Sequence, residues 1–194
     1  MGIRDTYERL CRTPSDISEH LPTLKLLSMQ CSTIVECGVR EVVSSYAFAS
    51  GLAADGKLIM VDPYRSKGVD DFLTKEPRAT FVHASDIECP LVETDMLFID
   101  TWHIYGQLKR ELAYWHDHVQ KYIVMHDTTV DAIYGETIRN GWDAEKQSRE
   151  SGIPINEIKK GLWPAVEEFL AEHPEWTVAA RYYNNNGLTV LTRV

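Results

Sequence analysis

Residues 95–129 constrain the fold of this chain more than any other stretch. An apolar run at 96–99 and a second apolar run at 122–125 are each short enough to be a buried strand. Between them, apolar residues recur at steps of three or four over 104–119, which predicts an amphipathic helix. A strand, a helix and a strand of this length predict a right-handed βαβ unit with two neighbouring parallel strands.

Four titratable side chains follow these two predicted strands. Asp100 and His103 come after the first strand, and His126 and Asp127 come after the second. Because the carboxyl ends of parallel neighbours meet at one edge of the sheet, we expect these four side chains to lie close together. Open α/β sheets bind their ligands at that edge, so the sequence predicts a functional site there.

Two earlier strands predict a nucleotide pocket at the same edge. The β-branched run at 32–37 contains Glu36, and Gly38 follows it before a helix begins. The next strand ends in Asp62, where an acid accepts hydrogen bonds from ribose hydroxyls in βαβ nucleotide sites. Only one glycine stands in the first loop, so the G-x-G-x-x-G fingerprint of NAD and FAD enzymes is absent.

Three further residues are candidates for this pocket. Tyr64 leaves the second strand two residues after Asp62, where its ring could lie against a bound nucleoside. Ser85 and Asp86 follow a predicted strand at 79–83, and they could reach the edge of an adenine. An ordinary turn formed by Ser85 and Asp86 is the alternative interpretation.

We expect residues 1–194 to form a single domain. Residues 1–30 are predicted as N-terminal helices, and the hydrophobic runs on either side of 184–186 predict a C-terminal hairpin. Residues 128–160 are polar and interrupted by Gly and Pro, which predicts an irregular lid over an acceptor substrate.

Composition excludes several classes of function. The net charge of −9 argues against nucleic-acid binding, which needs clustered Lys and Arg. No apolar run approaches the length of a membrane span. The four cysteines have no metal-binding spacing, which favours reduced thiols and a cytoplasmic location. The oligomeric state stays open between monomer and homodimer.

Together these motifs resemble class I S-adenosylmethionine-dependent methyltransferases, and most closely small metal-dependent sugar O-methyltransferases. The resemblance is carried by V-E-C-G at 35–38, V-D-P-Y at 61–64, S-D at 85–86, F-I-D-T-W-H at 98–103 and M-H-D-T-T at 125–129. It implies an α/β, Rossmann-like fold. The expected sheet is seven-stranded and mostly parallel, with a C-terminal antiparallel hairpin and helices on both faces.

The resemblance also implies how S-adenosylmethionine would bind. Glu36 and Gly38 would hold its methionine part, Asp62 its ribose and Asp86 its adenine. The full expected set of cofactor-binding residues is Glu36, Gly38, Asp62, Tyr64, Ser85, Asp86 and Asp100.

A divalent metal and a general base are implied as well. The D-x-x-H segment matches Asp100 and His103, and the expected metal ligands are Asp100, His126 and Asp127. Related enzymes carry two adjacent acids where this chain has His126 and Asp127. Oxygen ligands favour Mg²⁺ or Mn²⁺, and a histidine ligand would favour Mn²⁺, Fe²⁺ or Zn²⁺.

His103 is the expected catalytic base, together with Asp100 in the catalytic pair. A bound cation lowers the pKa of an acceptor hydroxyl, and a neutral imidazole can take its proton. The same cation should lower the pKa of His103. The alternative is that Asp100 only orients the cofactor, while His126 and Asp127 pair locally.

The expected acceptor is a small molecule or glycan, specifically a sugar hydroxyl. Aromatic side chains can lie against the apolar face of a sugar ring, and the candidates are Trp102, Tyr134, Trp142 and Trp163. A catechol is the rival acceptor. A metal-dependent hydroxylase that uses His103, His126 and Asp127 as a facial triad also stays open, as does a non-catalytic binding module.

Overall fold

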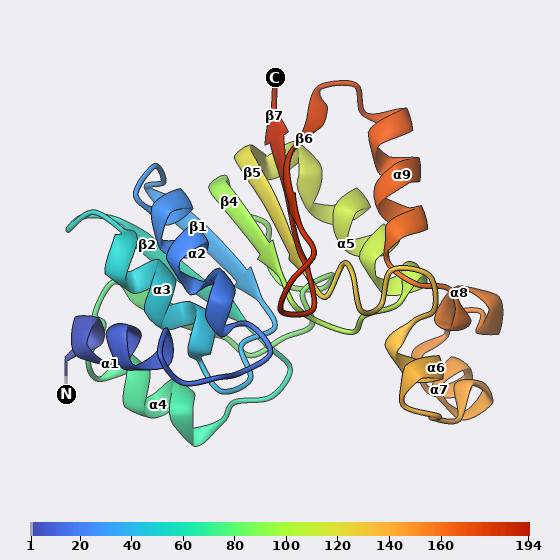
Figure 1. Ribbon diagram of the computed structural model, residues 1–194, viewed down its shortest axis with the longest axis horizontal. Coiled ribbons are helices and arrows are strands. Elements are labelled where there is room, and N and C mark those ends of the chain that lie inside the picture. The colour runs from blue at the N-terminus through green and yellow to red at the C-terminus, as the bar shows by residue number, and fades with distance from the viewer. Residues whose placement is uncertain (1) are drawn as a thin grey trace.

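A computed structural model describes residues 2–194, and it contains one seven-stranded sheet (Figure 1). The strand order is β3-β2-β1-β4-β5-β7-β6, in which β7 runs antiparallel to both of its neighbours and the other pairs are parallel. The strands are β1 (Thr33–Cys37), β2 (Lys57–Val61), β3 (Ala79–Val82), β4 (Thr94–Ile99), β5 (Val119–His126), β6 (Trp176–Tyr182) and β7 (Leu188–Arg193). The predicted mostly parallel sheet and its C-terminal hairpin are confirmed.

Helices connect these strands. They are α1 (Ile3–Leu10), α2 (Leu21–Ser28), α3 (Val43–Gly51), α4 (Lys67–Leu73), α5 (Tyr105–Trp115), α6 (Glu136–Arg139), α7 (Ala144–Ser151), α8 (Ile155–Lys159) and α9 (Trp163–Glu172), with short 3₁₀ turns η1 (Ser18–His20) and η2 (His116–His118). Helix α3 begins only at Val43, because Arg40 and Val42 adopt left-handed backbone angles that a helix cannot include. Within residues 2–194, no helix is long and apolar enough to cross a membrane.

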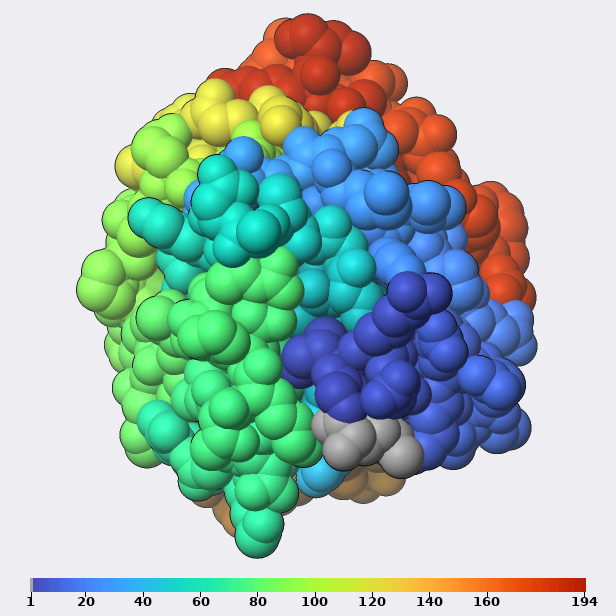
Figure 2. All heavy atoms as spheres, turned by 90° about the vertical axis from the view of Figure 1, so that its left-hand side faces the viewer, coloured from blue at the N-terminus to red at the C-terminus, as the bar shows by residue number. Residues whose placement is uncertain are grey.

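The sheet is covered on both faces, as the sequence predicts. One face packs against α1 to α4 through buried side chains such as Leu24, Phe48 and Phe72. The other face packs against α5 and α9 through side chains such as Trp115 and Phe169. Figure 2 looks onto the first side and shows α1, in dark blue, on the outside of its helical layer. Strands buried on both faces read as continuous apolar runs, which is why they were visible in the sequence.

The segment at 128–160 is largely helical, whereas the sequence suggests an irregular lid. Helices α6, α7 and α8 project to one side of the sheet (Figure 1). Their buried residues form a small separate core with Ile104, and the members from the segment are Ala144, Ile153 and Ile158. Gly106 of α5 allows close packing there, since a Cβ at this position would lie only 2.6 Å from Ile153 Cγ2. The segment is therefore fixed to the first turn of α5.

Candidate active site

A cavity of about 350 Å³ opens at the carboxyl ends of β1, β2 and β4. Five of the predicted cofactor residues line it: Gly38, Asp62, Ser85, Asp86 and Asp100. Thr101, Trp102 and Gln107 complete its wall on the side of α5. The structure thus brings residues from four separate loops to the edge where the sequence predicts a nucleotide pocket.

Gly38 allows the first of these loops to approach β4. Its φ angle is +83°, and a Cβ at this position would collide with the backbone carbonyl oxygen of Asp100. Glycine is the residue that accepts both conditions without strain. The glycine therefore sets the spacing between the ends of β1 and β4, in addition to bordering the cavity.

Asp62 holds two loops in place through backbone hydrogen bonds. Its Oδ2 accepts from the amides of Val39 and Arg40 at 2.8 and 3.2 Å, and its Oδ1 accepts from the amide of Tyr64 at 2.7 Å. The side chain still borders the cavity. Since a carboxylate has about four acceptor positions, capacity remains for ligand hydroxyls.

Asp86 borders the cavity and lies beside a second buried acid. Its Oδ1 lies 3.3 Å from Nε2 of Gln107, and its carboxylate is hydrogen-bonded to the side chain of Glu111, whose pKa burial and Asp86 hold well above the usual value. A protonated Glu111 occupies one acceptor position of Asp86, which leaves other positions for a ligand that donates a hydrogen bond. The exocyclic amine of an adenine is such a donor.

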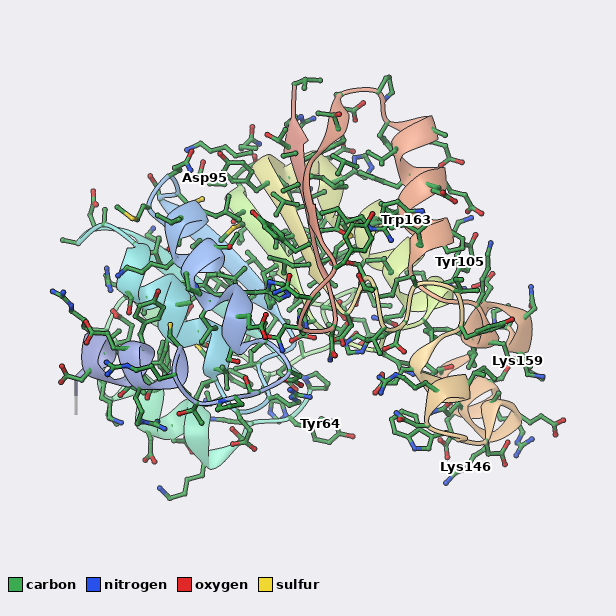
Figure 3. All side chains as sticks on the ribbon, in the orientation of Figure 1. Tyr64, Asp95, Tyr105, Lys146, Lys159 and Trp163 are labelled. Carbon is green, nitrogen blue, oxygen red and sulfur yellow. The ribbon has the colours of Figure 1, made fainter. Side chains whose placement is uncertain are left out.

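Two predicted cofactor residues do not line this cavity. Glu36 is fully buried, and its carboxylate accepts hydrogen bonds from the hydroxyls of Ser44 and Ser45 at the start of α3. Burial raises the pKa of Glu36 to about 8. Tyr64 is 82 % exposed and points outward at the lower edge of the molecule (Figure 3). Their contacts with a cofactor stay predictions.

His103 lies between carboxylates on both of its ring nitrogens. Nε2 is 3.1 Å from Oδ1 of Asp100 and 3.2 Å from Oδ2 of Asp127. Nδ1 is 3.2 Å from Oδ2 of Asp131 and 3.7 Å from Oε2 of Glu136. The predicted proximity of Asp100, His103 and Asp127 is therefore found in the structure.

This arrangement favours a charged histidine. Burial opposes the positive charge of His103, but the hydrogen bonds that its ring donates to Asp100 and Asp131, together with attraction to Asp127, outweigh burial and hold its pKa well above the usual value. The sequence predicts the opposite direction, a pKa lowered by a neighbouring cation. With protein groups alone, the imidazolium of His103 is one of the cations that balance the carboxylates.

His126 is part of the same group. Its Nδ1 lies 2.8 Å from Oδ2 of Asp127 and 3.5 Å from Oδ1 of Asp100, and its Nε2 lies 3.2 Å from the carbonyl oxygen of Asn185. Burial opposes protonation, but Asp100 and Asp127 raise the pKa of His126 to about 10. Asp127 itself has a left-handed φ of 57°, a conformation that non-glycine residues seldom adopt and that often marks a functional site.

The donor set fits a divalent cation. One ligand atom each from Asp100, His103 and Asp127 can be chosen so that all lie within 4.8 Å of one another. The expected set named His126 in place of His103, and both imidazoles contact the same two carboxylates. Carboxylate oxygens with an imidazole nitrogen are suitable ligands for Mn²⁺, and the carboxylates alone suit Mg²⁺.

Three residues of the 128–160 segment support His103, and sequence analysis missed all of them. Asp131 is fully buried and accepts two hydrogen bonds from Arg139, at 2.6 and 2.9 Å. The amide of Glu136 donates to the carbonyl oxygen of His103 at 2.9 Å, and the His103 amide lies 3.3 Å from the Glu136 carboxylate. A sequence signal existed for Asp131, which stands one helical turn after Asp127.

A second cavity of about 660 Å³ lies beside the first, and Trp102 borders both. Its other lining residues are Tyr64, Trp142, Gln147, Glu150 and Ser151. Two of the predicted acceptor residues, Trp102 and Trp142, are therefore brought together.

The other two predicted acceptor residues line neither cavity. The side chain of Tyr134 is 67 % exposed, and its backbone forms an isolated antiparallel bridge with that of Lys160. Trp163 lies beneath the guanidinium of Arg181, which is 3.2 Å from its ring centroid, and its indole N–H donates to Glu167. Figure 3 shows Trp163 beside the C-terminal hairpin.

No protein-family model matches this sequence, and no curated protein matches it. Solved structures do match over nearly the whole chain. A Staphylococcus aureus protein described as a caffeoyl-CoA O-methyltransferase has a TM-score of 0.67 at 15% identity, covering 100% of this chain and 93% of that one. A Bacillus cereus O-methyltransferase in complex with S-adenosylhomocysteine has a TM-score of 0.61 at 14% identity, covering 98% and 91%.

A third match is the O-methyltransferase TomG from Streptomyces achromogenes in complex with S-adenosylmethionine. Its TM-score is 0.60 at 17% identity, and the match covers 89% of this chain and 80% of that one. At sequence identities this low, the structural similarity establishes the fold, and the activity has to be argued from the site. The chain has the fold of the class I S-adenosylmethionine-dependent methyltransferases.

Proposed function

We propose that this protein is an S-adenosylmethionine-dependent O-methyltransferase that uses a divalent metal and methylates a sugar or glycan hydroxyl. The observation that carries the proposal is the position of Asp100. Asp100 borders the 350 Å³ cavity, and its carboxylate contacts His103, so the cofactor pocket and the acid–imidazole group meet at this residue.

The cavity has what a nucleoside cofactor requires. Asp86 and Asp62 both border the cavity with acceptor capacity, and Asp62 stands where ribose hydroxyls bind in this fold. Gly38 brings the first loop against Asp100. The methyl group then needs only in-line proximity to an acceptor oxygen, since a sulfonium is already activated.

Asp100 and Asp127 are the residues that would hold a divalent cation, with His103 or His126 as a nitrogen ligand. Such a cation lowers the pKa of a bound hydroxyl and orients it. Both carboxylates converge on the same imidazole nitrogens, at distances of 2.8 to 3.5 Å. A positive charge placed between the two carboxylates would therefore be stabilised by both.

His103 is proposed as the base, and it must be neutral to accept a proton. Its pKa falls when the charge of Asp100 and Asp127 is offset by a cation other than its own imidazolium. Asp131, on the other ring nitrogen, keeps the ring oriented and stabilises the imidazolium that forms. Many enzymes likewise pair a general base with a second residue that orients it.

The second cavity is proposed as the acceptor site. Trp102, Trp142 and Tyr64 offer aromatic surfaces, while Gln147, Glu150 and Ser151 offer hydrogen-bonding groups. Aromatic faces with nearby polar groups suit a sugar ring, which has an apolar face and a rim of hydroxyls. The caffeoyl-CoA name of the S. aureus neighbour makes a catechol-type acceptor the competing candidate.

The test is transfer of a labelled methyl group from S-adenosylmethionine to a panel of sugars, glycans and catechols. Each acceptor is assayed in chelator, in Mg²⁺ and in Mn²⁺, with Asp127→Asn and the exposed-site control Glu88→Gln. We expect sugar methylation that chelator abolishes, that Mg²⁺ or Mn²⁺ restores, and that Asp127→Asn lacks. Methylation of catechols alone would overturn the acceptor, and full activity in chelator would overturn the metal.

A further inference from the structure

A second group of metal-ligating side chains lies outside the candidate active site. His116 begins the 3₁₀ turn after α5, His173 follows α9, and Glu175 precedes β6. One ligand atom from each can be chosen so that all three lie within 4.8 Å of one another. Two segments that are distant in the sequence, the turn at His116 and the loop between α9 and β6, therefore place two imidazoles and a carboxylate together.

The geometry leaves nitrogen lone pairs available. The two imidazole rings lie 4.1 Å apart between centroids, and Nδ1 of His173 is 3.3 Å from Oε1 of Glu175. The side chain of His116 is only 13 % exposed, and its buried Nδ1 has no hydrogen-bond partner within residues 2–194. A buried imidazole nitrogen without a partner calls for a ligand that can satisfy it.

The charges around the group are compatible with a cation. Asp117 has an oxygen 3.4 Å from Nδ1 of His116, and its side chain is 78 % exposed, so it can move to offer a further ligand. Arg193 is the nearby positive charge. Its guanidinium donates to the carbonyl oxygen of Val119 and lies over the ring of Trp176, and its charge contributes to the lowered pKa values of His116 and Glu175, which favours their deprotonated, ligand-competent forms.

This group is separate from the candidate active site. His116 lies just before β5, whereas His126 and Asp127 lie at the far end of that strand. The eight residues of β5 span roughly 25 Å at the usual rise per residue. A metal held by His116 therefore cannot take part in chemistry at Asp100, and the inference does not rest on the proposed function.

We propose that His116, His173 and Glu175 form a zinc-binding site that fastens the ends of α5 and α9 to the start of β6. Two imidazole nitrogens and one carboxylate oxygen are a recurrent ligand set for Zn²⁺, with water or Asp117 completing a tetrahedron. Mg²⁺ prefers oxygen ligands and does not suit this group. Because His116 is distant in the sequence from His173 and Glu175, binding stabilises the folded chain over the unfolded one.

The competing explanation is aromatic packing. The ring of Phe169 lies 5.7 Å from the His116 ring and 4.6 Å from the His173 ring, so the imidazoles also extend an aromatic cluster. Packing alone requires no metal. The two explanations differ in whether the folded chain takes up zinc at this position.

The experiment is calorimetric titration of Zn²⁺ into the full chain. To remove the carboxylates of the candidate active site, it is done in an Asp100→Asn, Asp127→Asn background. We expect this background to bind one zinc per chain, and His173→Gln or His116→Gln to abolish that binding. His118→Gln is the matched control, since His118 lies on the same turn, is paired with Glu93 and should leave zinc binding unchanged.

Thermal unfolding gives a second readout. At a zinc concentration about 100-fold above Kd, the melting temperature of the background should rise by roughly 5–10 °C, and that of His173→Gln should not. If the background fails to fold, the same comparison in the wild-type chain should show one zinc fewer in His173→Gln. Equal zinc stoichiometry in His173→Gln and His118→Gln, or no zinc binding to the folded background, would overturn the proposal.

Discussion

An oxygen of Asp131 lies 3.2 Å from Nδ1 of His103, and Arg139 holds that carboxylate with two hydrogen bonds. His103 follows β4, whereas Asp131 belongs to the segment between β5 and α9. The segment that would meet an acceptor therefore also orients the proposed base. Removal of either partner should affect turnover more than cofactor binding.

The first prediction concerns Asp131. Asp131→Asn keeps the shape of the side chain but removes the charge that orients His103, so turnover should fall on the order of 10–100-fold. Affinity for S-adenosylmethionine should stay near that of the wild type. Asp143→Asn is the matched control, because Asp143 caps α7 in the same segment without contacting His103. Wild-type turnover in Asp131→Asn would remove Asp131 from the mechanism.

The second prediction concerns His103 itself. His103→Gln should lose about 10²–10⁴ in turnover, because the proton of the acceptor hydroxyl has no other positioned base. Cofactor affinity, measured by calorimetry, should change little. If the folded variant turns over within a few-fold of wild type, the proton goes elsewhere, and His126 is the next candidate.

The third prediction concerns Asp86. Asp86→Ala removes a carboxylate that borders the cavity, so S-adenosylmethionine should bind about 10–100-fold more weakly, which corresponds to roughly 1.5–3 kcal/mol for a hydrogen bond to a charged group. Glu88→Ala, at a neighbouring exposed carboxylate, serves as the control. Equal affinity in Asp86→Ala and Glu88→Ala would mean that Asp86 does not contact the cofactor.

The fourth prediction concerns pH and Glu36. Burial raises the pKa of Glu36 from 4.5 to about 8. Between these two pH values the folded chain keeps a proton on Glu36 that the unfolded chain has released. Its contribution to stability is complete below pH 4.5 and is lost as pH rises toward 8. Glu36→Gln mimics the protonated form and cannot lose that proton.

Urea unfolding of the wild type and of Glu36→Gln at pH 5 and pH 8 measures this effect. The difference in unfolding free energy should move in favour of Glu36→Gln by a few kcal/mol at the higher pH, at about 1.4 kcal/mol per unit of pKa shift. Other titrating groups are shared by both chains and cancel. A difference that is the same at both pH values would show that Glu36 ionises as freely as an exposed carboxylate.

The sequence predicts the sheet and the edge where the site lies. Strands buried on both faces leave continuous apolar runs, and a parallel βαβ unit fixes where they end. Local patterns and the handedness of the crossover are enough to predict that Asp100, His103 and Asp127 lie close together. In the structure both carboxylates lie within hydrogen-bonding distance of the His103 ring.

The contacts that the sequence did not predict depend on long-range packing. Asp131 stands four residues after Asp127 and its amide donates to the Asp127 carbonyl oxygen, but the two hydrogen bonds that its carboxylate accepts from Arg139 depend on how the 128–160 segment folds back. Trp163 was an acceptor candidate from its residue type alone. The guanidinium of Arg181, on a strand late in the chain, covers its ring instead.

The central claim is that the cavity beside Asp100 binds S-adenosylmethionine. Calorimetric titration of S-adenosylmethionine into the full chain tests it most directly, once in chelator and once in Mg²⁺. We expect saturable binding of one molecule per chain in both buffers, since protein hydrogen bonds to Asp62 hold the loops around the cavity without a metal. The absence of saturable binding in both buffers would contradict it.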